Sequence, residues 1–165
     1  MLFFTSTEEF PYEKGELLDI AATLDVNEYK GSRSVSIIVK DVKAHSEDAR
    51  QILESRRVFE TFCRGGALSR EELNSITPDR GDFALLYRFL RDRQGYFHKT
   101  ETLVSRLNNR LSYGKIRVAL EAMNDLGLIR IMEGIRSNRI TLNRVAGKVN
   151  LESAPIIKRL REVTQ

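Results

Sequence analysis

The feature that most constrains the fold of this chain is a change in the spacing of its apolar residues near residue 46. From Leu18 to Val42, apolar and polar residues largely alternate, which is typical of β-strands that are buried on one side. After residue 46, apolar residues recur with the spacing of amphipathic helices. We therefore predict an α+β protein, with a short antiparallel β portion over residues 1–45 and a mainly helical domain over residues 46–165.

The β portion is predicted to contain three strands. A short apolar piece lies at residues 2–4, an alternating strand begins at Leu18, and a strand rich in β-branched residues runs from Val35 to Val42. The turn between the two longer strands covers Tyr29 to Ser34, where Gly31 can adopt a positive φ. The apolar run of the last strand predicts that it is buried. Because such a sheet is thin, we expect it to be part of a β domain rather than a whole one.

Helical periodicity, together with capping residues, divides the rest of the chain into short helices. Ser46 is a predicted N-cap, and Ser69 with Glu72 fits a capping box. The predicted helices are Asp48–Cys63, Arg70–Ser75, Asp82–Asp92, Thr100–Asn108, Tyr113–Leu126 and Ala154–Val163. A hairpin is predicted from Leu128–Met132 and Arg139–Leu142, after a left-handed Gly127. Helix, turn, helix and hairpin is the order of a winged helix-turn-helix, which we place at about residues 82–145.

The distribution of charge indicates two modules with different partners. Residues 1–47 carry five basic and nine acidic side chains, whereas residues 48–165 carry 22 basic and 14 acidic ones. Between Lys99 and Lys148 there are ten basic residues and four acidic ones. An excess of arginine and lysine suits an anionic partner, since each phosphate contact releases a counterion. We therefore expect the second module to face an anionic partner, such as nucleic acid, and the alternative is a solvated basic face.

The winged helix predicts which residues would make these contacts. In this fold the second helix of the turn enters the major groove, and the hairpin lies on the adjacent backbone. Lys115 and Arg117 are expected on the groove-facing helix, and Arg136, Asn138 and Arg139 at the tip of the wing. The alternative is that the unit binds protein and merely exposes its basic side chains.

The β-hairpin offers a second candidate site for nucleic acid. Tyr29 precedes Lys30 and Arg33 around the turn, so an aromatic ring lies close to positive charge. Single-stranded nucleic acid binds to sheets that combine stacking rings with cations. The alternative is a packed hairpin tyrosine with no ligand.

No constellation in the sequence supports catalysis by this chain alone. His45 and His98 stand without a second ligand at metal-binding spacing, and Gly65-Gly66 lacks the lysine of a phosphate-binding loop. Cys63 is followed by Arg64, whose charge favours the thiolate, but without a His or Asn partner we expect a packed cysteine at the end of the helix. A single cysteine excludes an internal disulfide and fits a reducing compartment. With neither a signal peptide nor a membrane-spanning run, we expect a cytoplasmic protein that has no membrane contact.

The segment GELLDIAATLDVNEYKGSRSVSIIVKDVK resembles the late strands of the OB-fold in bacterial RecJ, the single-strand-specific DNA exonuclease. The shared pattern is Asp19-Ile20, Leu24, the string Asn27-Glu28-Tyr29 with Gly31, and the apolar strand from Val35 to Asp41. The resemblance covers about the first 43 residues, and the helical portion is more loosely similar to the C-terminal extension of some RecJ proteins. It implies a partial OB-fold at residues 1–45 and a partner in single-stranded DNA.

The chain lacks the catalytic part of that family. RecJ enzymes hydrolyse DNA with Mg²⁺ or Mn²⁺ held by aspartate and histidine residues, including an Asp-His-His triplet that is absent from this sequence. No catalytic residue, metal ligand or cofactor is therefore assigned to this chain, and the metal is expected in the parent nuclease's missing core. We expect a C-terminal fragment cut within the OB-fold. Its incomplete sheet would expose an edge that could support a homodimer.

Two functions follow from these observations. The first is a non-catalytic DNA-binding accessory module of a RecJ-type 5′-3′ exonuclease in DNA repair and recombination. The second is a protein-interaction module that docks on the nuclease core or on a repair partner such as single-strand binding protein. A free transcription regulator is a weaker third hypothesis.

Overall fold

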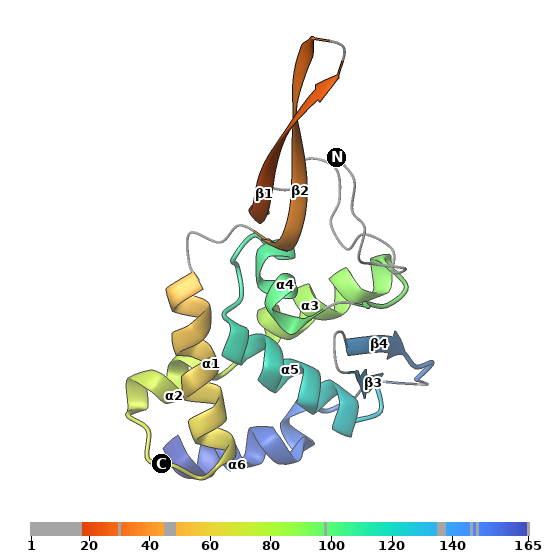
Figure 1. Cartoon of the computed structure of the whole chain (residues 1–165). Coiled ribbons are helices and arrows are strands. Elements are labelled where there is room, and N and C mark those ends of the chain that lie inside the picture. The colour runs from red at the N-terminus through yellow and green to blue at the C-terminus, as the bar shows by residue number, and fades with distance from the viewer. Residues whose placement is uncertain are drawn as a thin grey trace. The chain divides into compact units, whose positions relative to one another are not determined.

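The computed structural model describes residues 18–29, 31–44, 49–97, 99–134, 138–145, 147 and 149–164 (Figure 1). The chain divides into two compact units, Met1–Glu47 and Asp48–Gln165. The described residues form two two-stranded antiparallel sheets and six α-helices, which confirms the α+β class. The predicted strand at residues 2–4 and the predicted N-cap Ser46 lie outside the described residues.

The first unit is built on a long β-hairpin. Strand β1 (Leu18–Tyr29) pairs antiparallel with β2 (Ser32–Ala44), and Tyr29 lies opposite Ser32 at the turn. Both strands extend further than predicted, and Gly31 has the expected positive φ, +78°. A bulge shifts the register between Ala21 and Ala22. Because the described part is a two-stranded ribbon, it does not by itself establish an OB-fold.

One face of this hairpin is apolar and exposed to solvent. Cross-strand pairs such as Leu24 with Ile37 and Val26 with Val35 place their side chains on the same face. The residues of this apolar hairpin face are Ile20, Leu24, Val26, Val35 and Ile37, which are 47–67% exposed. The prediction that the second strand is buried is thus wrong for Val35 and Ile37. A two-stranded ribbon needs a second layer to bury such a face.

The second unit contains every helix that the sequence predicted, with shifted ends. They are α1 (Ala49–Cys63), α2 (Arg70–Ile76), α3 (Arg80–Asp92), α4 (Thr100–Arg106), α5 (Tyr113–Asp125) and α6 (Pro155–Thr164), preceded by the 3₁₀ turn η1 (Leu151–Ser153). The predicted capping box of Ser69 and Glu72 is present. A second capping box, formed by Asp79 and Asp82, starts α3 before its predicted beginning.

A third segment pairs with the β-hairpin of the second unit, and the sequence did not indicate this pairing. Strands β3 (Ile129–Glu133) and β4 (Asn138–Leu142) pair antiparallel, as predicted. The segment between α3 and α4 adds one further pairing, since Tyr96 and Ile140 exchange two backbone hydrogen bonds of 2.9 and 2.7 Å. The order is therefore helix α3, bridging residue Tyr96, helices α4 and α5, then the β3–β4 hairpin.

Helix α5 forms the centre of the second unit. It contacts α1, α2, α3, α4, α6 and β3. Figure 1 shows it running between α1 and α2 on one side and the β3–β4 hairpin on the other. Eight of its residues are buried: Tyr113, Gly114, Ile116, Val118, Ala119, Leu120, Ala122 and Met123. Such burial around most of its circumference is typical of a core helix rather than a surface helix.

Among the helices of the described ranges, none has the length and apolar character that crossing a membrane requires.

Candidate nucleic-acid interface

The N-terminal turn of α5 is enclosed by the chain's own helices. The backbone N–H of Gly114 donates to Ser55 Oγ in α1 over 2.8 Å, and Ser112 Oγ donates to the carbonyl of Ser75 in α2 over 2.9 Å. A Cβ added at Gly114 would lie 2.3 Å from Ile76 Cγ2. Because a recognition helix contacts base edges through its N-terminal residues, α5 does not offer the open end that groove insertion needs.

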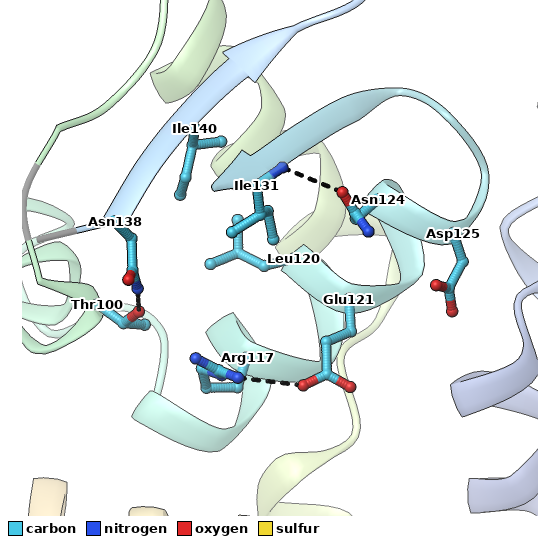
Figure 2. Close-up of a pocket in the computed structure, with 9 residues that line it drawn as sticks. All are labelled: Thr100, Arg117, Leu120, Glu121, Asn124, Asp125, Ile131, Asn138 and Ile140. Atoms are coloured by element: carbon cyan, nitrogen blue, oxygen red, sulfur yellow. Dashed lines mark hydrogen bonds and ion pairs between the residues drawn. The ribbon is translucent and has the colours of Figure 1, made fainter. Parts of the chain in front are cut away.

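The two cations predicted on this helix are engaged within the fold. Lys115 Nζ lies 2.8 Å from Asp82 Oδ2, and these side chains are 28% and 15% exposed. The guanidinium of Arg117 lies 3.3 Å from Glu121 Oε1 and 5.3 Å from the centre of the Phe59 ring. Figure 2 shows Arg117 and Glu121 together at one side of a cavity. Both cations therefore connect α5 to its surroundings rather than projecting from it.

The cavity in Figure 2 lies between α5 and the inner side of the β3–β4 hairpin and has a volume of about 300 Å³. Asn138 Nδ2 donates to Oγ1 of the buried Thr100 over 3.1 Å, and the N–H of Ile131 donates to Asn124 Oδ1 over 3.1 Å. These bonds join the hairpin to α4 and α5. Asn138, predicted to bind nucleic acid, thus points inward to Thr100.

The opposite side of the hairpin carries a different set of side chains. Tyr96 and Ile140 are buried, so the strand alternation turns their neighbours Phe97 and Arg139 outward. The Arg139 guanidinium lies 5.3 Å from the centre of the Phe97 ring. Met132 is the cross-strand partner of Arg139, and Arg130 is that of Thr141. We call the set Phe97, Arg130, Met132, Arg139 and Thr141 the outer sheet face.

A second arginine–aromatic contact lies at the end of α3. The Arg93 guanidinium is 4.8 Å from the centre of the Phe89 ring, which lies 6.3 Å from the ring of Tyr96. Tyr96 bridges to Ile140, so this contact adjoins the strand that carries Arg139. A second arginine–aromatic pair thus lies next to the bridging residue Tyr96.

The predicted residues of the β-hairpin do not form a single cluster. Tyr29 is 72% exposed and lies opposite Ser32, on the face of the ribbon that also carries Asn27 and Ser34. Arg33 lies opposite Glu28, and its Nε is 3.2 Å from Glu28 Oε2. Strand alternation places Tyr29 and Arg33 on opposite faces. Lys30, like Arg136 of the predicted wing, lies outside the described residues.

Cys63 is an exposed residue at the end of α1, but its sulfur is partly buried and its thiol is not activated. Burial raises the pKa of Cys63 above its ordinary value, and the charge of Glu121 adds to this effect. The charges of Arg159 and Arg117 act in the opposite direction but do not outweigh burial, and Arg64 lies 3.7 Å from Glu60. Within the ranges the structure describes, no group of three His, Cys, Asp or Glu side chains could hold a metal ion.

Of the residues predicted from sequence, the structure places Arg139 on the outer sheet face. The sequence reasoning missed its neighbours Phe97, Arg130 and Met132. Strand alternation within Arg139–Leu142 could have indicated an outward Arg139, but the contribution of Phe97 depends on a single bridging residue. Comparison with protein-family models, with curated proteins and with solved structures found no significant match to this chain.

Proposed function

We propose that this chain is a non-catalytic nucleic-acid-binding module of a RecJ-type single-stranded-DNA exonuclease. The sequence pattern around Asn27-Glu28-Tyr29 supports the family, and the order α3, Tyr96, α4, α5, β3 and β4 supports a winged helix. In this proposal the divalent metal and the hydrolysis belong to the parent nuclease's core, and the protein acts in the cytoplasm.

The observation that carries the proposal is the outer sheet face. Its two arginines, Arg130 and Arg139, are exposed, and Arg139 lies beside the exposed ring of Phe97. Arginine on a protruding hairpin reaches phosphates without desolvating a core, and the resulting release of counterions favours binding. Helix α5 is enclosed and Lys115 is held by Asp82, so we assign the contact to the hairpin rather than to a recognition helix.

The proposal predicts salt-dependent binding that depends on the outer sheet face. Fluorescence anisotropy of a labelled single-stranded oligonucleotide should show an affinity that falls steeply with salt concentration. The double variant Arg130→Glu/Arg139→Glu should weaken binding and reduce the slope of log affinity against log salt by roughly 1 to 2. These changes should leave the thermal unfolding midpoint nearly unchanged, since both side chains are exposed.

A matched control makes the same change of charge elsewhere. Arg50 on α1 and Lys158 on α6 are exposed, and Arg50→Glu/Lys158→Glu should leave the slope close to that of the wild type. Lys115→Gln should also leave the salt slope unchanged, because Lys115 is held by Asp82 within the fold. No binding by the wild-type chain at micromolar concentration would contradict the proposal, and so would equal losses in the control and test variants.

A second candidate function rests on the apolar hairpin face. Five large apolar side chains there are 47–67% exposed, which is typical of a surface that another layer covers. A docking surface for the nuclease core or a repair protein, such as single-strand binding protein, would account for it, as would a homodimer through the hairpin edge. Leu24→Thr/Ile37→Thr should abolish such association in sedimentation velocity and leave oligonucleotide affinity unchanged.

A further inference from the structure

We propose that Phe97 is a stacking site for an unpaired nucleobase, with Arg139 binding the adjacent phosphate. The inference rests on the proposed function and assigns one side chain to each part of a nucleotide. It concerns the outer sheet face only, and it does not involve α5 or the β-hairpin of the first unit.

The backbone holds Phe97 in a fixed position beside β4. Tyr96 exchanges both of its backbone hydrogen bonds with Ile140, and Gly95 has a φ of +127°. A Cβ at Gly95 would lie 2.6 Å from the carbonyl oxygen of Ile140, so only glycine allows the chain to pass this closely. The ring is therefore presented by a constrained segment, which reduces the conformational entropy lost on binding.

The exposure of Phe97 is not explained by packing. Its side chain is 49% exposed, whereas its neighbour Tyr96 is 3% exposed and supplies the contact with the core. Met132, which is 47% exposed, lies on the same outer sheet face, directly opposite Arg139 on the neighbouring strand. A row of ring, guanidinium and thioether thus crosses the surface. The ring and the thioether can lie against the flat face of a base, and the guanidinium between them can reach the adjacent phosphate.

The charge of this surface selects an anionic aromatic ligand. Arg139 contacts the Phe97 ring and Arg130 lies on the neighbouring strand, so the outer sheet face carries two exposed arginines. A nucleotide supplies both a π-face and a phosphate within one residue. We therefore favour single-stranded nucleic acid over an acidic peptide, which becomes an outcome of the test.

The chain offers a direct optical test because it contains no tryptophan. Phe97→Trp in the full chain introduces a single indole, which a stacked base should quench. Tyr29→Trp tests the stacking predicted for the first unit, and Leu53→Trp, at a 65% exposed position on α1, is the negative control. We expect an oligothymidylate to quench the fluorescence of Phe97→Trp at least twofold and to leave that of Leu53→Trp unchanged.

An abasic oligonucleotide of equal length separates stacking from phosphate binding. We expect it to bind the wild type about tenfold more weakly than the base-bearing strand. Phe97→Leu should lose this difference while retaining the affinity for the abasic strand. Circular dichroism melting of each variant verifies that it remains folded.

The outcomes distinguish the inference from the proposed function. Salt-dependent binding without quenching of Phe97→Trp, and without any effect of Phe97→Leu, would overturn the stacking site and leave the nucleic-acid module standing. Quenching by an acidic peptide but not by the oligonucleotide would overturn both. Quenching of Tyr29→Trp alone would move the stacking site to the first unit.

Discussion

Gly114 shows how closely helices pack in the second unit. Its missing side chain lets Ile76 approach, and its N–H donates to Ser55, so one residue joins α5 to both α1 and α2. We expect Gly114→Ala to lower the free energy of unfolding by about 1–3 kcal/mol, because the added methyl group overpacks the contact. Urea denaturation followed by circular dichroism measures the change.

The exposed Gly81 in α3 is the matched control for this substitution. A Cβ at that position would meet Asp79 Oδ1 at 3.1 Å and no other atom within 4 Å. Alanine's higher helix propensity should offset the shift of a few tenths of an ångström that Asp79 Oδ1 must make, so Gly81→Ala should change the free energy of unfolding much less than Gly114→Ala. If Gly114→Ala left the free energy of unfolding unchanged, α1 and α2 could move away from α5. The enclosed N-terminal turn would then no longer argue against α5 as a recognition helix.

At the scale of single residues, hydrogen bonds between residues close in sequence were predictable, and those between residues far apart in sequence were not. The capping role of Ser112 and the Ser69–Glu72 pair follow from a fixed three-residue spacing. The partner of Lys115 is Asp82, 33 residues away, and no sequence spacing indicates it. This is why Lys115 was expected to point outward, whereas it lies in an ion pair within the fold. The partner of Arg117 is Glu121, four residues along the same helix, a spacing that the sequence does show.

Among the helices, α2 depends on its N-terminal capping box. The backbone N–H of Ser69 lowers the pKa of the Glu72 carboxyl, and the guanidinium of Arg57 adds to this effect. A carboxyl whose pKa is lowered on folding stabilises the fold above its unfolded pKa of about 4.5, and this contribution is lost as the pH falls through the folded value.

Glu72→Gln should therefore destabilise the protein near pH 7, and its difference from the wild type should shrink as the pH drops below about 4.5. Ser69→Ala should cost about 1 kcal/mol at neutral pH. Thermal melts at several pH values measure both effects. Glu71→Gln changes an adjacent exposed carboxylate outside the capping box, and a pH dependence equal to that of Glu72→Gln would contradict the argument.

The elements themselves were predictable to different degrees. Long periodic segments such as α1 and α5 were predicted within a few residues, because apolar spacing and caps extend over several turns. The bridging residue Tyr96 was missed, since one strand residue has no periodicity. The outer sheet face depends on that bridge, so the sequence indicated Arg139 as a candidate but not its contact with Phe97.

At the scale of the whole molecule, the two units differ in how they bury apolar surface. The buried core of the second unit contains residues from Val58 to Leu160, drawn from all six of its helices and from both strands of its hairpin. The first unit instead exposes the apolar hairpin face. Charge and periodicity predict two modules that meet near residue 46. The exposure of the apolar hairpin face depends on whether another layer covers it, and the sequence does not specify such a layer.

This contrast predicts that residues 48–165 fold without the first unit. Their core lies wholly within the unit, so the isolated segment should unfold cooperatively in urea. Leu90 is fully buried, so Leu90→Ala should leave a cavity and lower the free energy of unfolding of this segment by about 2–5 kcal/mol. Oligonucleotide binding should keep its salt slope, because Arg130 and Arg139 belong to this segment. Loss of binding on removal of residues 1–47, with unfolding still cooperative, would transfer the interface to the hairpin that carries Tyr29. Non-cooperative unfolding would instead show that the helical core needs the first unit.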